Sequence, residues 1–287
     1  MKLLVTGATG QLGSIVVETL LKTVPAANLA VSVRNPEKAE SLRAQGVDVR
    51  FGDFDQPESL AAAFAGIDRL LIISADGDTE TRIRQHSAAV AAAKAAGVRF
   101  IAYTSATNAQ ESTLFLAEVH RATENAILAT GIPYAFLRNN WYTENELGTI
   151  NAVLGGAPWI TSAGSGKVGW ANRRDYAEAA AIVLAGEGHE NKVYEFGGQP
   201  LTQEQFAAAL SDAIGREVPV QQVDDATYAS IMGQAGVPDF VVPILVAIQS
   251  AIREDALNLV SDDLEKVLGR PSTPVADAVR AIVSNQG

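Results

Sequence analysis

Residues 2–13 read KLLVTGATGQLG, in which the apolar run Leu3–Thr6 is followed by glycines at Gly7, Gly10 and Gly13. An apolar run that ends in closely spaced glycines predicts a buried strand, a tight turn and the start of a helix. Such a turn lets the backbone approach a pyrophosphate, which then lies at the N-terminus of the helix. The stretch therefore predicts a dinucleotide-binding strand–turn–helix.

The end of the second predicted strand indicates which dinucleotide is bound. This strand, Leu29–Val33, is followed by Arg34. An acidic residue at this point would bind the ribose hydroxyls of NAD, whereas an arginine suits the 2′-phosphate of NADP. We therefore expect Arg34 to bind that phosphate and the cofactor to be NADP(H). Asp53, just after the third predicted strand, is expected either to contact the adenine or to cap the following turn.

The order of the predicted elements indicates the fold. Apolar strands alternate with helices, such as the alanine-rich Thr79–Ala96, as far as Arg138. Strands that are apolar throughout and joined by helices form parallel sheets covered on both faces. After Arg138 the pattern becomes mainly helical, although Val193–Phe196 is predicted as a strand that joins the sheet. We expect an α/β fold: a Rossmann-like, doubly wound parallel sheet with a smaller, mainly helical C-terminal lobe.

This change of pattern also predicts the domains. Residues 1–138 are expected to form the NADP(H)-binding Rossmann domain, with 170–198 returning to it. Residues 139–169 and 199–287 are expected to form a lobe on the substrate side. Within this lobe the apolar stretch Phe240–Ile252 is either lobe core or the face of a homodimer.

Composition excludes several classes of function. The formal net charge of −11 at pH 7 is wrong for a nucleic-acid partner, which requires clustered Lys and Arg. The chain has no cysteine, and its three scattered histidines form no metal-binding motif, so no metal site is expected. No signal peptide and no apolar run of about 20 residues is found, so we expect a cytoplasmic protein without a membrane partner.

Several stretches together resemble the NmrA-like branch of the atypical short-chain dehydrogenases, and the resemblance covers nearly the whole chain. They are Gly7–Gly13, Arg34, Gly52-Asp53, Tyr103–Ser105 and Leu137–Asn139. Further stretches are similar to the bacterial group of NADPH:quinone oxidoreductase 2 and triphenylmethane reductase: Arg34–Pro36, Ala93–Val98, Phe100–Ser105 and Trp141-Tyr142. The glycine motif alone is weakly specific, but these stretches in this order are a specific combination.

The resemblance implies three groups of cofactor-binding residues, all at the carboxyl ends of predicted strands, where open α/β sheets bind ligands. Around the pyrophosphate it places Gly7, Ala8, Thr9, Gly10, Gln11 and Leu12. Along the rest of the cofactor it places Ser74, Ala75 and Asp76. At the nicotinamide and the substrate it places Arg138, Asn139, Asn140, Trp141, Tyr142 and Thr143.

One feature of the wider superfamily is missing. Conventional members carry a Tyr-x-x-x-Lys pair on the helix after the fifth strand, and the tyrosine protonates the reduced carbonyl. Aligned on Glu124, these two positions hold Leu116 and His120. A positioned acid accelerates ketone reduction by about 10²–10⁴-fold, whereas quinones give phenolate-like products and carbocationic dyes need no proton. His120 is a candidate contact to the ribose or substrate, or else a hydrogen-bonded structural histidine.

These observations predict an NADPH-dependent oxidoreductase that transfers hydride to a small aromatic acceptor, quinone-like or triphenylmethane-dye-like. Catalysis would rest on holding acceptor and nicotinamide together. The alternative is a non-catalytic NADP(H)-binding redox sensor, which the same missing pair permits. Isomerase or dehydratase chemistry has less support, because neither paired carboxylates nor a Tyr-Lys pair is present.

Overall fold

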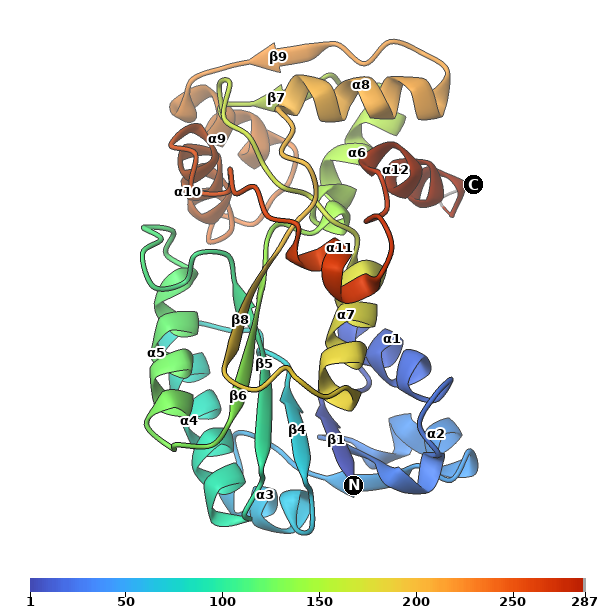
Figure 1. Cartoon of the computed structure of the whole chain (residues 1–287). Helices are drawn as coiled ribbons and strands as arrows, with labels where there is room; N and C mark the ends of the chain where they lie inside the picture. Colours follow the sequence, from blue (N-terminus) through green and yellow to red (C-terminus); the bar gives the residue numbers. More distant parts are fainter. Residues whose placement is uncertain (286–287) are drawn as a thin grey trace.

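The computed structural model describes residues 1–285, which form a sheet domain and a mainly helical lobe (Figure 1). The strands of the main sheet are β1 (Leu3–Thr6), β2 (Leu29–Val33), β3 (Asp48–Phe51), β4 (Arg69–Ile72), β5 (Phe100–Ala106), β6 (Tyr134–Asn139) and β8 (Lys192–Phe196). All pairs are parallel, and the order is β3-β2-β1-β4-β5-β6-β8. This is the doubly wound order of dinucleotide-binding sheets, in which the direction of winding reverses beside β1.

Helices cover both faces of the sheet. The helices of the sheet domain are α1 (Gln11–Leu20), α2 (Glu40–Ala44), α3 (Pro57–Phe64), α4 (Thr79–Ala95), α5 (Ala117–Leu128), α7 (Arg173–Ala185) and α11 (Asp263–Leu268). Residues of α1, α7 and α11 share one apolar core with the sheet, and residues of α3, α4 and α5 share the other. Figure 1 shows these two layers on opposite sides of the strands.

The sequence of β1 explains how both cores form. All four of its residues are buried, and its register pairs Leu3 with Leu29 on one side and with Arg69 on the other. Successive side chains of a strand point to opposite faces. Leu3 and Val5 accordingly lie in one core, while Leu4 lies in the other. A strand buried on both faces holds the glycine turn at its carboxyl end in a fixed place.

The strand predicted at Val193–Phe196 joins the main sheet. Strand β8 pairs with β6, matching Phe196 with Asn139, and α7 packs beside α1. The sheet thus receives its last strand and one covering helix from residues far along the chain.

The lobe contains more regular structure than its sequence pattern indicates. Its elements are α6 (Leu147–Leu154), β7 (Trp159–Thr161), α8 (Gln203–Ile214), β9 (Val220–Gln222), α9 (Asp225–Gln234), α10 (Val242–Arg253) and α12 (Val275–Ser284). The segment 143–161, which holds three glycines and one proline, shows no clear period, yet it contains α6 and β7. These short elements are held by tertiary packing, since Ile150, Val153 and Trp159 lie in one apolar cluster with α8 and α10.

Three short 3₁₀ helices complete the secondary structure: Ala26–Asn28, Pro36–Ala39 and Thr143–Glu146. The second of them leads directly into α2. The side chain of Asn35 caps this turn by accepting from the Glu37 amide.

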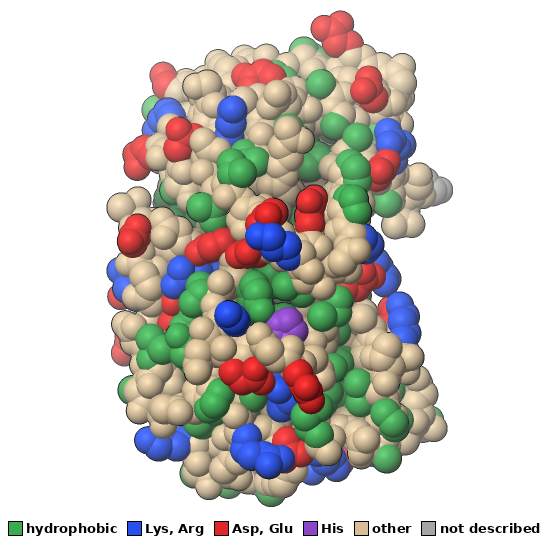
Figure 2. All heavy atoms as spheres, viewed as in Figure 1, with side chains coloured by type: hydrophobic (Ala, Val, Ile, Leu, Met, Phe, Trp, Pro, Cys, Tyr) green, Lys and Arg blue, Asp and Glu red, His purple; other side chains and the backbone are tan. Residues whose placement is uncertain are grey.

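The outer surface shows no single dominant charge on the face in view. Figure 2 shows Lys and Arg side chains interspersed with Asp and Glu over both the sheet domain and the lobe. Within residues 1–285, no helix combines the length and apolarity that crossing a membrane requires. The cytoplasmic location stays a prediction.

Candidate active site

The glycine turn between β1 and α1 has the shape that a pyrophosphate requires. Gly7 adopts a φ of +62°, and its carbonyl accepts a hydrogen bond from the Gly10 amide at 2.9 Å. A Cβ added to Gly13 would lie 2.2 Å from the same carbonyl oxygen, so only glycine fits there. No side chain caps the N-terminus of α1, and its first turn has no acidic residue. The helix N-terminus is therefore open to an anion.

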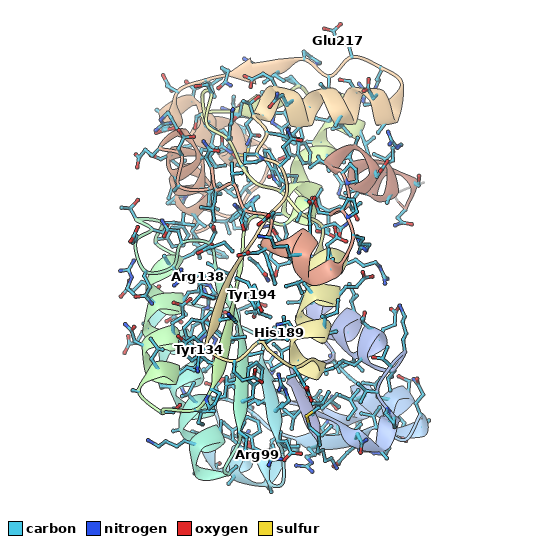
Figure 3. The ribbon with its side chains drawn as sticks, in the orientation of Figure 1. Arg99, Tyr134, Arg138, His189, Tyr194 and Glu217 are labelled. Carbon is cyan, nitrogen blue, oxygen red and sulfur yellow. The ribbon has the colours of Figure 1, made fainter. Side chains whose placement is uncertain are left out.

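A cavity of about 950 Å³ lies along the carboxyl ends of the strands. Strand β6 runs from Tyr134 to Arg138 toward the lobe, whereas Arg99, just before β5, lies at the opposite end of the sheet (Figure 3). The cavity thus opens on the side of the sheet that faces the lobe. Its lining includes Gly7, Thr9–Gly13, Ser32–Asn35, Lys38, Gly52–Phe54, Ile73–Asp76, Arg82, Gln85, Thr104–Thr107, Leu114, Leu116, His120, Asn139–Tyr142, Asn145, Arg173 and Leu257.

Most of the predicted cofactor-binding residues therefore meet at one cavity. Those outside its lining are Ala8, Arg138 and Thr143. Ala8 is 1% exposed and Thr143 is fully buried, so each supports the wall from behind. Residues that the sequence did not single out also line it, among them Lys38, Arg82 and Leu257.

The end of β2 carries the positive charge expected for a phosphate. Arg34 and Lys38 are exposed and line the cavity together. Arg34 has no carboxylate within 4.0 Å among the described residues, so its charge is available to a ligand. Asp53 caps the turn that follows it, because its carboxylate accepts a hydrogen bond from the Asp55 amide at 3.0 Å. This favours the capping alternative for Asp53.

The segment after β4 is held in place by side chains beneath it. Thr6 Oγ1 accepts from the Ile73 amide, and Thr104 Oγ1 accepts from the Ser74 amide, each at 2.9 Å. His86 Nε2 accepts from the Ala75 amide at the same distance. His86 is fully buried, and burial lowers its pKa to about 4, so the ring is neutral. These bonds fix the backbone of Ile73–Ala75 in the cavity wall.

His120 lies in the cavity wall as a neutral imidazole. Its Nδ1 is 2.9 Å from the Tyr103 hydroxyl, and its Nε2 is 3.5 Å from Nη2 of Arg82. Burial, assisted by the Arg82 charge, lowers the pKa of His120 to about 3. Because arginine only donates, we assign the ring proton to Nδ1. An imidazole in this state has no proton on the nitrogen nearest Arg82, so it is a poor general acid at neutral pH.

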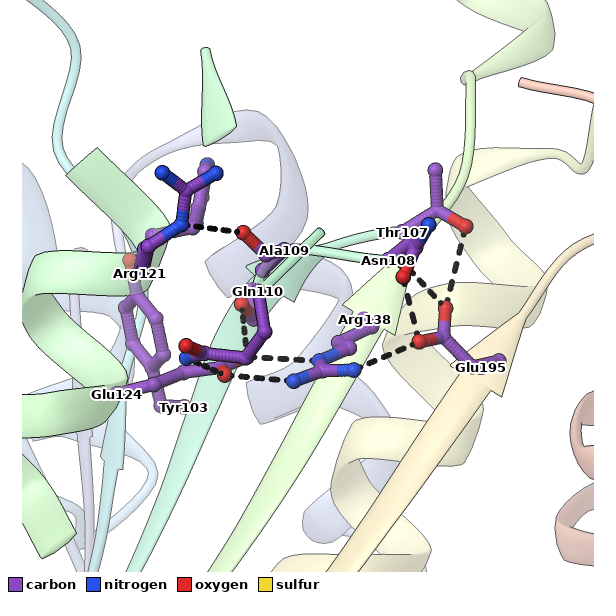
Figure 4. Close-up of polar contacts among 11 residues, drawn as sticks. Tyr103, Thr107, Asn108, Ala109, Gln110, Arg121, Glu124, Arg138 and Glu195 are labelled. Atoms are coloured by element: carbon purple, nitrogen blue, oxygen red, sulfur yellow. Dashed lines mark hydrogen bonds and ion pairs between the residues drawn. The ribbon is translucent and has the colours of Figure 1, made fainter. Parts of the chain in front are cut away.

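Arg138 lies beside the cavity and is occupied by carboxylates. Its Nε and Nη2 donate to Glu124 at 2.9 and 2.8 Å, and its Nη1 donates to Glu195 at 2.9 Å (Figure 4). Glu124 also accepts from Ser105 Oγ, and Glu195 accepts from Thr107 Oγ1. These bonds tie β6, α5 and β8 to the end of β5 and the residue that follows it. In this arrangement Arg138 supports the cavity wall formed by residues 105–107.

The residues after β6 form the wall nearest the lobe. Asn139 Nδ2 donates to the Tyr142 hydroxyl at 2.8 Å, and Asn140 Nδ2 donates to the Leu257 carbonyl at 3.0 Å. Trp141 Nε1 donates to Glu146 at 3.2 Å. The lobe therefore fixes this wall through Leu257 and Glu146, which are far apart in sequence.

The cavity fits NADP(H) on its own features. Ser32 Oγ and Asn139 Oδ1 are buried lining atoms without a hydrogen-bond partner in the described part of the chain. Buried polar atoms are normally paired, so these two suit polar atoms of a ligand. Together with the open N-terminus of α1 and the Arg34 charge, they match a phosphorylated dinucleotide.

Known proteins of similar sequence and structure bind the same kind of cofactor. Quinone oxidoreductase 2 of Escherichia coli strain K12 is 43% identical over 276 residues, which cover 96% of each chain. The structure of Citrobacter sp. triphenylmethane reductase complexed with NADP(H) matches with a TM-score of 0.94 and 44% identity, covering 98% of this chain and 100% of that one. The Escherichia coli NADPH-dependent quinone oxidoreductase complexed with NADPH matches with a TM-score of 0.93 and 42% identity, covering 98% and 99%.

The family follows from these similarities and from a match of the family model. The model described as the NmrA-like family matches residues 1–270. The glycine turn, the basic residue after β2 and the seven-stranded parallel sheet are consistent with that match. The chain belongs to the NmrA-like family.

Proposed function

We propose that this NADP(H)-dependent oxidoreductase transfers hydride to a quinone in the cavity between the sheet and the lobe. The observation that carries the proposal is one continuous cavity, in which the glycine turn and Arg34 lie together with the segment after β6. Relatives at 42–44% identity are named as NADPH-dependent quinone oxidoreductase and triphenylmethane reductase. These enzyme names favour the reductase over the non-catalytic sensor.

Different groups of residues would bind different parts of the cofactor and the acceptor. The turn Gly7–Leu12 would hold the pyrophosphate, and Arg34 with Lys38 would hold the 2′-phosphate. Ser74–Asp76 would lie along the cofactor, and Asn139–Tyr142 would border the nicotinamide and the acceptor. When bound, NADPH supplies the hydride. The protein contributes mainly the relative position of the two reactants.

The absence of the Tyr-x-x-x-Lys pair agrees with a quinone acceptor. Leu116 lines the cavity just before α5, and His120 is neutral with a pKa of about 3. Neither side chain is a proton donor suited to an alkoxide at neutral pH. A quinone that accepts hydride becomes a hydroquinone monoanion, which takes its proton from water.

We further propose that residues 139–169 and 199–285, apart from α11, form the acceptor-side lobe, while 170–198 and α11, which packs on α7 and β8, belong with the sheet domain. Leu257 lines the cavity and supports this division, because it brings the lobe to the site. Phe240, next to α10, is 78% exposed, which suits the homodimer face considered for this segment. The oligomeric state stays a prediction.

The proposal is tested by mixing the purified protein with NADPH and a panel of quinones while absorbance of the reduced nicotinamide is followed. We expect NADPH oxidation that depends on both protein and quinone. Binding of NADPH is measured in parallel by its fluorescence. Tight binding without turnover of any quinone would overturn the reductase and favour the sensor.

A further inference from the structure

Arg82 is a buried cation that forms no ion pair within residues 1–285. Its side chain comes from the first turns of α4 and lines the cavity, yet the residue is only 9% exposed. Nη2 donates to Ser74 Oγ at 2.8 Å and approaches His120 Nε2 at 3.5 Å. Nε is buried and has no partner, and no carboxylate oxygen of residues 1–285 lies within 4.0 Å.

The surroundings of Arg82 do not neutralise its charge. His86 and His120 are both neutral, and Tyr103 is a protonated phenol whose pKa burial raises to about 12. Asp76 is near enough to favour the charged guanidinium, but it forms no ion pair with it. Apart from Asp76, the groups around the cation on the protein side are therefore neutral.

A buried charge is costly unless it is paired. The other buried arginine of the described residues, Arg69, pairs with Glu190, and the part-buried Arg138 lies between Glu124 and Glu195. Arg82 does not follow this rule. The side of its guanidinium that no protein group pairs faces the cavity. A group that acquires negative charge in the cavity would complete its pairing.

We propose that Arg82 stabilises the negative charge that develops on a quinone oxygen during hydride transfer, and that it selects neutral acceptors over cationic ones. This inference rests on the proposed function. A neutral quinone gains a hydride and becomes a monoanion, while the nicotinamide is oxidised. A triphenylmethane carbocation gains a hydride at its central carbon and becomes neutral. The guanidinium favours the first change and repels the second acceptor before it reacts.

The main test replaces Arg82 by Gln, which keeps a donor for Ser74 and removes the charge. We expect kcat/KM for 1,4-naphthoquinone to fall by about 100-fold, as for loss of an oxyanion-stabilising donor. Crystal violet, a cationic dye, should bind the NADP⁺-loaded variant about tenfold more tightly, because a like charge has been removed. Arg82→Lys should retain most of the quinone activity.

A matched control lies on the same helix. Arg84 is 54% exposed in its side chain, pairs with Asp55 and does not line the cavity. Arg84→Gln makes the same change of net charge and should leave both measurements unchanged. If Arg82→Gln fails to fold, Arg82→Leu, which fills the site without a polar group, should give the same change in selectivity.

A second measurement needs no turnover. 4-Nitrophenol changes absorbance when it ionises, so titration reports its apparent pKa in the NADP⁺-loaded protein. A cation within about 4–6 Å should lower that pKa by about one pH unit or more, and Arg82→Gln should restore it. If wild type binds NADPH but reduces no quinone, the proposed function fails. The titration still tests whether Arg82 stabilises an anion in the cavity.

Three results would overturn the inference. One is an equal loss of quinone turnover and dye binding in Arg82→Gln. Another is weaker NADPH binding as the sole effect, which would make Arg82 a cofactor anchor. The third is an apparent pKa of 4-nitrophenol that is the same in wild type and variant.

Discussion

Arg138 donates two parallel hydrogen bonds to Glu124, a fully buried carboxylate on the neighbouring helix. The pair stands beside the cavity and fixes Ser105 in its wall. Bidentate arginine–carboxylate pairs are both strong and geometrically specific. The family resemblance places Arg138 at the cofactor, but in the structure Arg138 supports the cavity wall.

Replacing Glu124 by Ala should destabilise the protein strongly, because Arg138 would keep its buried charge and lose its main partner. Removing one member of a buried pair costs about 3–5 kcal/mol. The free energy of unfolding in urea is the measurement. Asp262→Ala, which breaks the exposed pair with Lys266, should cost less than about 1 kcal/mol. Equal effects of the two changes would refute a structural role for Glu124.

Arg34→Ala should weaken binding of NADPH much more than binding of NADH. A charge-assisted hydrogen bond contributes about 1.5–3 kcal/mol, or roughly 10- to 100-fold in affinity. Fluorescence titration with each cofactor measures the two dissociation constants. Arg43→Ala, an exposed change on α2 in a pair with Glu40, should affect neither. Similar losses for both cofactors would show that Arg34 does not recognise the phosphate.

Gly13→Ala should abolish tight cofactor binding and destabilise the turn. The added methyl group would meet the Gly7 carbonyl at 2.2 Å, and overpacking of this kind costs about 1–3 kcal/mol. Gly148→Ala is the matched control, since nothing lies within 4 Å of its Cβ position in α6. That control should be neutral or slightly stabilising. Unchanged NADPH affinity in Gly13→Ala would contradict the predicted turn contact.

The stability of the protein should decrease as the pH falls below about 6.5. His86 and His120 have pKa values of about 4 and about 3 in the native state, below their ordinary value of 6.5. At a pH between the native pKa of each histidine and 6.5, that histidine is protonated in the unfolded chain but not in the native protein. Each histidine therefore adds a loss of about 1.4 kcal/mol per pH unit on acidification, and its stabilising contribution is complete above pH 6.5.

His86→Gln should remove the contribution of His86 to this dependence of the free energy of unfolding on pH. The measurement is the free energy of unfolding of wild type and variant between pH 6.5 and about 4.5, compared as slopes, so that carboxylate contributions cancel. His189 is only partly buried, and His189→Gln should change the slope much less. A slope unchanged by His86→Gln would mean that this histidine is not neutral in the native protein.

The parts of the site that could be predicted are local in sequence. Gly7, Gly10 and Gly13 lie within seven consecutive residues, and Arg34 lies directly after a strand, so spacing alone indicates where they meet a cofactor. The β-branched and aromatic residues of β8, Val193, Tyr194 and Phe196, likewise indicate a strand before its partner is known. The parts that could not be predicted depend on distant segments. Leu257 reaches the cavity only because the lobe folds back over the sheet.

By itself the sequence determined the parallel sheet, the glycine turn and the preference for NADP(H), because each depends on short-range periodicity, backbone sterics or one charge at a strand end. Only the tertiary structure decided what individual polar side chains do. It gives Arg138 two carboxylates, 14 and 57 residues away, and among the described residues it gives Arg82 none within 4.0 Å. Whether a charge is paired or available depends on which groups meet in three dimensions. Burial makes the free-energy difference between a paired and an unpaired charge large.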